Sequence, residues 1–225
     1  MELLNTMLLL RPPGVYRPQG DTDLLSETLR RTPVPAGARV LDIGTGTGAV
    51  SVAAARHGDC RVTAVDVSLR AVLAARLNTM IRGLPVRVRR GDLFAPVRGQ
   101  LFDVILANPP YVPGHVALPS LHSRARAWNA GLDGRHVLDR ICAQAPEHLA
   151  PGGTLLMVHS ALSGIEQTLD MLRAAGLTAE VAAGGMEPFG PVMRARAHVL
   201  ERRGLIRPGQ RYEELVVVRA GRAEN

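Results

Sequence analysis

Short apolar runs alternate with longer amphipathic stretches along the first half of the chain, a pattern typical of alternating strands and helices. The runs Arg39–Ile43 and Phe102–Ala107 are almost continuously apolar, as in buried strands. Arg61–Asp66 is rich in β-branched residues, and Val86–Arg90 alternates valine with arginine, as at the edge of a sheet. Two helices are predicted, over Ala49–Arg56 and from Ser68, the N-cap, to about Ile81.

The second half of the chain continues this alternation. An amphipathic helix is predicted over Gly134–Leu149, with a turn at Pro151–Gly153 after it. A further helix, Ser163–Ala175, stops at Gly176. Three more strands are predicted, over Thr154–His159, Leu177–Ala183 and Glu214–Arg219. A basic helix or loop is predicted over Pro191–Arg203, between the last two strands. Repeated strand–helix units predict an α/β fold with a mostly parallel seven-stranded sheet, helices on both faces, and one antiparallel strand near the end.

The composition of the chain indicates where the protein is located, and it gives little support for nucleic-acid binding or for a metal site. The 225 residues carry a net charge of +7, and every basic residue is an arginine, which reflects GC-rich codons better than it indicates a nucleic-acid partner. The two cysteines stand alone in the sequence, so no metal site is expected. The apolar first ten residues lack the basic start and cleavage site of a signal peptide and are too short to span a bilayer. We expect a cytoplasmic protein that does not bind a membrane.

A glycine-rich turn follows the first predicted strand. Gly44, Gly46 and Gly48 permit a tight turn and close backbone approach to a ligand, and Asp66 ends the next strand about 20 residues later, where a ribose-binding acid is expected. This pattern alone also fits a dinucleotide site. Asp42 favours the other interpretation, because a carboxylate there would repel a pyrophosphate but suit the cationic methionine end of S-adenosylmethionine.

Two further residues fit the same cofactor. Asp92 follows the third predicted strand and can accept from an adenine amino group, while Leu93 packs on the ring. Taken alone, Asp92 is better explained as a turn or cap residue. Together with the glycines, both residues favour a nucleotide-like cofactor.

The tetrapeptide Asn108-Pro109-Pro110-Tyr111 closes the strand Phe102–Ala107. Two prolines fix the backbone, since each ring locks φ and removes an N–H. The carbonyls and the Asn108 amide can then face one small polar group, with Tyr111 covering it. Such a clamp suits a planar –NH2 group awaiting a methyl group, and these four residues are the candidate catalytic residues.

The combination of glycine turn, spaced acids and clamp resembles the class I S-adenosylmethionine-dependent methyltransferases, which have a Rossmann-like fold. Tyr16–Leu25 is similar to the YxPxxDTxLL segment of the HemK-like glutamine methyltransferases, and Ala127–Arg135 to their AWxxGxxGR stretch. The resemblance runs from about Tyr16 to Val218 and is greatest for the short, single-domain archaeal and eukaryotic branch. One departure is Gln19-Gly20, which replaces the acidic pair usual before Asp21.

That resemblance implies specific roles. Asn108, with Pro109 and Tyr111, would hold the substrate amide, and the implied cofactor contacts are Thr22, Asp42, Gly44, Asp66, Asp92 and Leu93. Members of this branch often pair with a small zinc-binding activator, which the edge strand Val86–Arg90 could accept by strand addition. We expect residues 1–35 to form a segment that packs on a methyltransferase domain spanning residues 36–225.

The expected activity is methyl transfer to a protein glutamine, of the kind found in the Gly-Gly-Gln segment of release factors. Three alternatives remain open: methylation of adenine N6 in a nucleic acid, since those enzymes share an (N/D)PPY clamp; methylation of a protein lysine or a small molecule; and a cofactor-binding scaffold without catalysis. The scarcity of aromatic residues for base stacking counts against the first. The arginines between residues 194 and 207 favour a solvated helix face over a surface that tracks phosphates.

Overall fold

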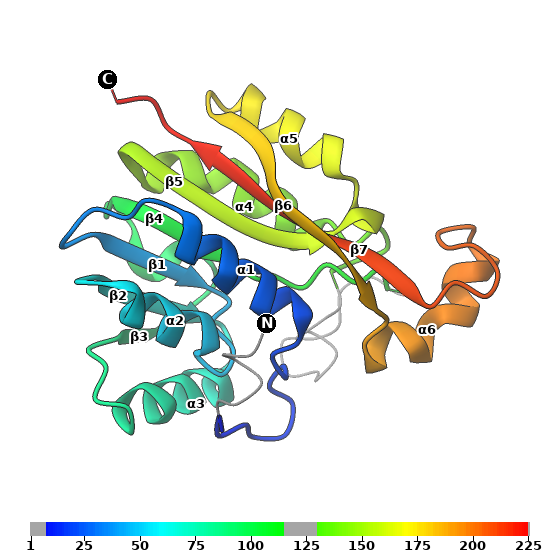
Figure 1. The fold of residues 1–225 in the computed structure, drawn as a ribbon, viewed down its shortest axis with the longest axis horizontal. Coiled ribbons are helices and arrows are strands. Elements are labelled where there is room, and N and C mark those ends of the chain that lie inside the picture. Colours follow the sequence, from blue (N-terminus) through cyan, green and yellow to red (C-terminus); the bar gives the residue numbers. More distant parts are fainter. Residues whose placement is uncertain (1–7, 115–129, 225) are drawn as a thin grey trace.

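The structure is a computed structural model that describes residues 8–114 and 130–224. Its helices and strands alternate through most of the chain (Figure 1). In chain order they are α1 (Gly20–Arg31), β1 (Arg39–Ile43), α2 (Ala49–His57), β2 (Arg61–Asp66), α3 (Leu69–Met80), β3 (Arg87–Arg90), β4 (Phe102–Ala107), α4 (His136–His148), β5 (Leu149–Ser160), α5 (Ile165–Ala174), β6 (Thr178–Pro188), α6 (Pro191–Arg202) and β7 (Tyr212–Gly221).

The strands form one seven-stranded sheet in the order β3-β2-β1-β4-β5-β7-β6. The first five strands are parallel, and β7 runs antiparallel between β5 and β6. This confirms the predicted mixed sheet and its antiparallel strand, and it places β3 at an edge. The order reverses at β1 and β4, so the space beyond their carboxyl ends is the expected ligand site.

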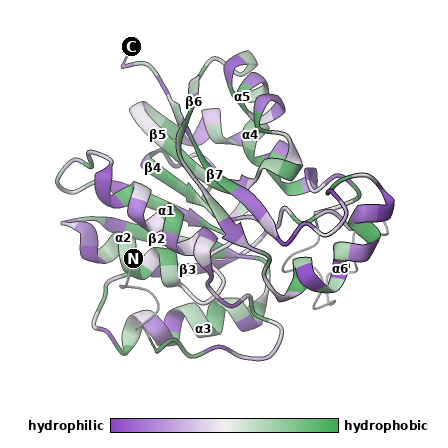
Figure 2. Ribbon diagram, turned by 45° about the vertical axis from the view of Figure 1, so that its right-hand side comes forward, coloured by the Kyte–Doolittle hydropathy of each residue, from purple (hydrophilic) through white to green (hydrophobic). Residues whose placement is uncertain are grey.

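Alternate residues of the strands lie on opposite faces of the sheet and belong to two separate hydrophobic cores. Val40, Val104 and Leu156 face α1 and α2, whereas Leu41, Ile105 and Leu155 face α4 and α5. This alternation follows from the two-residue period of a strand, and it puts helices on both faces, as predicted. Figure 2 shows the hydrophobic residues concentrated along the central strands, with hydrophilic residues on the outer sides of the helices.

The sequence analysis did not predict α1. This helix packs against α2 and the last three strands, and Leu25 and Leu29 belong to the same core as β1 and β4. Because α1 shares that core, the structure shows no break near residue 35, and the proposed division there stays a prediction. Residues 1–7 of the predicted segment lie outside the described residues.

The predicted turn at Pro151–Gly153 is wrong. Those residues lie inside β5, where the pairing with β4 jumps from Phe102↔Leu149 to Val104↔Thr154, so the proline and glycines form an irregularity within a continuous strand. Other boundaries also move: β6 continues five residues beyond Ala183, α5 starts at Ile165 after a 3₁₀ turn, and β7 extends beyond both of its predicted ends. Among the described helices, none is long and apolar enough to cross a membrane.

Candidate active site

One large cavity opens at the carboxyl ends of β1, β2 and β4 and has a volume of about 670 Å³. Its wall includes the glycine turn, the ends of β2 and β3, the segment 14–22, the clamp after β4, and residues from β6, α6 and β7. Ten of the predicted site residues lie in this wall: Thr22, Gly44, Gly46, Asp66, Asp92, Leu93, Asn108, Pro109, Pro110 and Tyr111. The turn and the clamp therefore face one space.

The glycine turn is built as the sequence requires. Gly44, Gly46 and Gly48 have φ values of 72°, 57° and 83°, a left-handed conformation that side chains with a Cβ rarely adopt. Gly48 also needs its small size, since a Cβ would lie 3.1 Å from the Ala75 backbone of α3. Gly48 thus packs α2 against α3 and is not part of the cavity wall.

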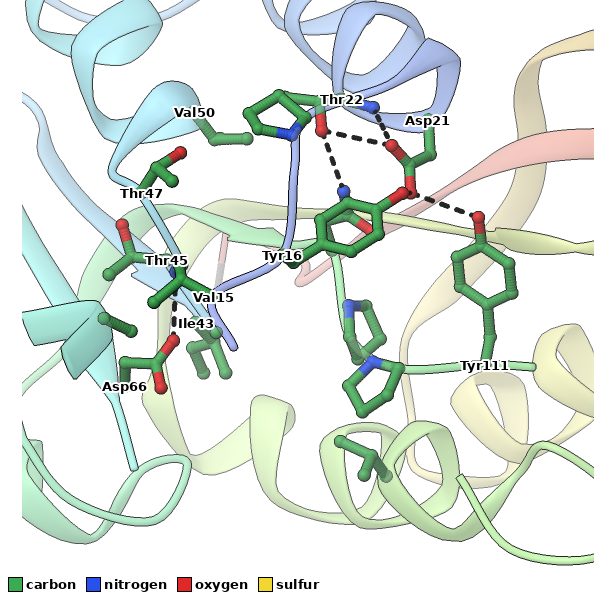
Figure 3. Close-up of a pocket in the computed structure, with 18 of the residues that line it drawn as sticks. Val15, Tyr16, Asp21, Thr22, Ile43, Thr45, Thr47, Val50, Asp66 and Tyr111 are labelled. Carbon is green, nitrogen blue, oxygen red and sulfur yellow. Dashed lines mark hydrogen bonds between the residues drawn. The ribbon is translucent and has the colours of Figure 1, made fainter. Parts of the chain in front are cut away.

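Asp66 lies at the end of β2 beside the turn. Its two carboxyl oxygens accept from the N–H groups of Gly46 (2.9 Å) and Ser68 (2.8 Å). Burial raises the pKa of Asp66, and these backbone hydrogen bonds oppose the rise. An oriented carboxylate with free lone pairs at this position can accept from two ribose hydroxyls (Figure 3).

Asp42 lies behind the turn and not in the cavity wall. It is 1% exposed and accepts from the hydroxyls of Thr45 (2.6 Å) and Ser51 (2.5 Å). Burial raises its pKa to about 6, while both hydroxyls lower it. Asp42 therefore fixes the turn from behind, and direct contact with a cofactor stays a prediction.

Asp92 and Leu93 follow β3 at the far side of the cavity. Asp92 is about half exposed and pairs with Arg140 of α4 at 2.6 Å. Leu93 has a φ of 46°, a left-handed conformation shared with no other described residue except glycines. This unusual backbone holds the Leu93 side chain partly buried at the cavity wall.

The clamp is fixed from several elements. The Asn108 side chain donates from Nδ2 to the Thr22 hydroxyl at 3.2 Å, and the Tyr111 hydroxyl donates to Asp21 at 3.1 Å. The Tyr111 carbonyl accepts from Ser163, and a Cβ on Gly134 would lie 2.2 Å from that same carbonyl oxygen. The clamp is therefore closely packed before any substrate arrives.

Asp21 is a central residue that the sequence analysis did not single out. Its Oδ2 accepts from the hydroxyls of Tyr16 (2.7 Å) and Tyr111 (3.1 Å), and its Oδ1 accepts from the N–H (2.6 Å) and hydroxyl (3.1 Å) of Thr22 (Figure 3). The side chain is 2% exposed. The YxPxxDT pattern contains both Tyr16 and Asp21, so the signal for this pair was present in the sequence.

Two more acids approach Asp21 from the end of the chain. Glu213 of β7 is 6% exposed and its Oε2 has no hydrogen-bond partner among the described residues. Burial raises its pKa to about 7, with the nearby Asp21 and Glu187 adding to the rise. The Glu187 carboxyl group lies against Gly20, where a Cβ would come within 2.5 Å of it. Glu187 thus fills the space beside the glycine that departs from the family pattern.

Two arginines, one in α6 and one directly after it, support the clamp from outside. Arg196 donates to the Pro113 carbonyl at 2.9 Å, and Arg203 donates to the carbonyls of Gly114 and Leu132, both at 2.8 Å. The expectation of a solvated helix face does not hold for these two side chains, because they bind backbone next to the clamp. The residues Ala127–Asn129 of the predicted AWxxGxxGR stretch lie outside the described residues.

Comparison with known sequences gives a consistent family. Residues 7–126 match the family model described as the methyltransferase small domain. A protein of Methanocaldococcus jannaschii provisionally named protein N5-glutamine methyltransferase is 35% identical over 181 residues, covering 80% of this chain and 90% of that protein. The release factor glutamine methyltransferase of Geobacter sulfurreducens is 37% identical over 172 residues, covering 73% of this chain and 59% of that enzyme. The chain spans less than two thirds of this second relative.

A solved structure gives the same fold. The E. cuniculi Mtq2–Trm112 complex, described as responsible for the methylation of the eRF1 translation termination factor, has a chain that matches with a TM-score of 0.64 at 20% identity. The match covers 93% of this chain and 99% of that one. At this identity the likeness supports the fold alone.

Proposed function

Because the chain belongs to the methyltransferase small-domain family and is similar to protein N5-glutamine methyltransferases along most of its length, we propose that it methylates the side-chain nitrogen of a protein glutamine. The enzyme takes its methyl group from S-adenosylmethionine. The proposed acceptor is the glutamine of a Gly-Gly-Gln segment in a peptide-chain release factor, the substrate named for the Geobacter sulfurreducens relative. With such a substrate, the proposed site of the reaction is the cytoplasm.

The residues of the glycine-turn end fit the donor. The Asp66 carboxylate offers lone pairs to the hydroxyls of a ribose, and Leu93 offers an apolar face for a base. We propose that Gly44, Gly46, Asp66, Asp92 and Leu93 form this donor site, and that Asp42 and Gly48 support it from behind. We propose that Thr22 and Asn108, which were also expected to contact the cofactor, belong to the clamp where it meets the donor. When bound there, the donor supplies an electrophilic methyl group on a positively charged sulfur.

The clamp end fits the acceptor, and this arrangement carries the proposal. An amide nitrogen is a poor nucleophile because its lone pair is delocalised into the carbonyl. Hydrogen bonds from its two N–H groups to the Asn108 oxygen and the Pro109 carbonyl orient the nitrogen and stabilise the positive charge that develops during transfer. Tyr111 is almost fully buried and held by Asp21, so it covers the planar group without moving.

The decisive experiment incubates the enzyme with labelled S-adenosylmethionine and a purified release factor. We expect label on the glutamine of the Gly-Gly-Gln segment, identified by mass spectrometry, and none when that glutamine is replaced by alanine. Label that disappears with nuclease treatment of a lysate would favour adenine methylation, label on lysine or on a small molecule would favour those acceptors, and no label would favour the scaffold.

The acidic clamp end argues against the nucleic-acid alternative. Asp21 and Glu187 lie in the cavity wall, and their carboxylates would repel a phosphate backbone that approached the clamp. A neutral glutamine side chain meets no such repulsion. We therefore rank protein glutamine above nucleic-acid adenine as the acceptor.

We also propose that a small zinc-binding activator docks at the β3 edge, as the matched complex contains a second protein. β3 is an edge strand, and α3 beside it, with the residue that caps its end, exposes a stripe of apolar side chains: Leu69, Leu73, Leu77, Met80 and Ile81. Such a stripe is unusual on a surface that stays in water. Strand addition at β3 would bring a partner over it.

Substitutions on α3 test the activator proposal. Leu73→Arg with Met80→Arg should prevent a stable complex with a co-expressed activator on size exclusion, while calorimetry shows unchanged donor affinity. Leu132→Arg alters an equally exposed leucine elsewhere and serves as the control. Full activity of the purified chain alone would contradict the proposal.

A further inference from the structure

We propose that Thr22 is a positioning residue whose hydroxyl group, oriented by Asp21, decides which side of the Asn108 amide faces the methyl acceptor. This inference rests on the proposed function in one respect, that the acceptor is an –NH2 nitrogen. Thr22 was expected to contact the cofactor, but its hydroxyl lies between Asp21 and Asn108. The consequence for the clamp follows from counting donors and acceptors.

Asp21 receives hydrogen bonds and has none to give. Its carboxyl group accepts from two hydroxyls at Oδ2 and from an N–H and a hydroxyl at Oδ1. The Tyr16 hydroxyl itself accepts from Gln19 Nε2 at 2.8 Å, which leaves its own proton for Asp21. The carboxylate therefore holds its neighbours in the donating orientation.

Through Thr22, the hydrogen-bond directions set by Asp21 reach the clamp. A threonine hydroxyl has one hydrogen, and at Thr22 that hydrogen is committed to Asp21, so its oxygen can only accept from Asn108. Asn108 must then present Nδ2 to Thr22, at 3.2 Å, and its Oδ1 on the opposite side of the amide plane. The Thr22 side chain is 3% exposed, so water does not readily replace it as the partner.

The orientation of this amide matters for the reaction. An acceptor nitrogen of –NH2 type brings hydrogens, which need an oxygen opposite them. If the Asn108 amide were turned over, its own N–H groups would face those hydrogens, and a favourable contact would become a repulsive one. A single hydroxyl proton remote from the acceptor therefore determines whether the clamp attracts or rejects it.

A double-mutant cycle between Thr22 and Asn108 tests this polarity. Thr22→Val is nearly isosteric and removes the hydroxyl, so it should reduce kcat by about 10-fold to 100-fold, the effect of one polar contact of about 1–3 kcal/mol. Its S-adenosylmethionine affinity should stay within about threefold of the wild type. Thr22→Ser keeps the hydroxyl and should retain most of the activity.

The sign of the coupling is the sharper measurement. In Asn108→Asp, a carboxylate oxygen replaces Nδ2 and faces the Thr22 oxygen, which has no proton to offer. Adding Thr22→Val should then raise the thermal midpoint of the Asn108→Asp variant, whereas the same change lowers it in the wild type. This measurement needs no substrate, so it is informative even where the variants are inactive and whatever the acceptor proves to be.

Two results would overturn the proposal. If Thr22→Val lowers the thermal midpoint equally in both backgrounds, the Thr22 hydroxyl does not donate to Asp21 and accept from Asn108 as we propose. If the same variant loses its donor affinity by more than about tenfold, Thr22 acts on the cofactor. Failure of the wild type to methylate any glutamine would instead count against the proposed function and leave the stability cycle intact.

Discussion

The two ends of the cavity are built by different means. At the glycine-turn end, backbone N–H groups and the carboxylates of Asp42 and Asp66 lie within one strand–helix–strand unit. At the clamp end, side chains from the segment before α1, the segment after β4, β6 and β7 converge on Asp21 of α1, and they come from positions as far apart in the sequence as Tyr16 and Glu213. The first end is local and rigid through its backbone, whereas the second depends on a network of side chains.

Substitution of Asn108 should give the largest difference between the two ends, because it should reduce methyl transfer and leave donor affinity almost unchanged. Asn108→Ala removes the oxygen that orients the acceptor, so we expect methyl transfer to fall by at least about a thousandfold, as for the loss of an oriented dipole at a developing charge. Donor affinity measured by calorimetry should stay within a few-fold. A variant that no longer binds S-adenosylmethionine would show that Asn108 belongs to the donor end.

A glycine beside the clamp should give the next largest effect. Gly134→Ala places a Cβ 2.2 Å from the Tyr111 carbonyl, in addition to the cost of about 1–2 kcal/mol for a left-handed residue with a side chain. We expect a kcat reduced by about 10-fold to 100-fold, as for misplacement of a reacting group by a fraction of an ångström, and an unchanged donor affinity.

Gly176→Ala is the matched control for Gly134→Ala. Gly176 has a similar φ of 84°, but a Cβ there meets nothing within 4 Å. It should therefore show the loss of stability without the loss of kcat. Equal kcat values for the two variants would mean that the packing at Tyr111 is unimportant for the reaction.

Asp66→Ala perturbs the opposite end. We expect donor binding to weaken by about tenfold to 100-fold, since a carboxylate that accepts from two hydroxyls is lost, while kcat at saturating donor changes little. Calorimetry and a donor titration at fixed acceptor measure both quantities. Unchanged donor affinity would remove Asp66 from the proposed ribose site.

The remaining effect concerns stability alone and leaves the reaction untouched, and it is a pH dependence at the clamp end. Burial raises the pKa of Glu213 from 4.5 to about 7, so the folded protein holds this proton more tightly than the unfolded chain. The stabilisation is present below about pH 4.5 and is lost as the pH rises through 7. Glu213→Gln should flatten the decline in unfolding free energy between pH 5 and 8 by about 2–3 kcal/mol, measured by denaturant titration. An unchanged slope would contradict the assignment to Glu213.

The same contrast explains what the sequence could predict. β1, β2 and β4 were located because their apolar runs are buried on both faces, and the glycine turn was located because its spacing is local. The turn at Pro151–Gly153 was wrong as a boundary between elements, because Leu149 before it pairs with β4 and Thr154 after it pairs with both β4 and β7, so the strand continues on either side of the irregularity. The α1 helix was missed among prolines, although its polar first turn and Leu25 and Leu29 mark it in retrospect.

The clamp end was only half predictable. Asn108 to Tyr111 form a contiguous motif, and Tyr16 and Asp21 belong to a recognisable segment. Glu187 and Glu213 carry no local signal, because only the pairing of β6 with β7 brings them near Asp21. Tertiary contacts of this kind need a structure.

One buried amide connects the segment before α1 to the opposite side of the cavity. Asn78 of α3 is fully buried, exchanges two hydrogen bonds with the backbone of Leu10, and donates a third to Thr47. Val15 and Tyr16 of that segment lie between the two ends of the cavity (Figure 3). We therefore expect entry and escape of the donor to depend on this anchor, which lies well outside the reacting groups. Changes at position 78 offer a means to shorten the donor's residence time, measurable by stopped-flow dissociation, while the chemical step is left intact.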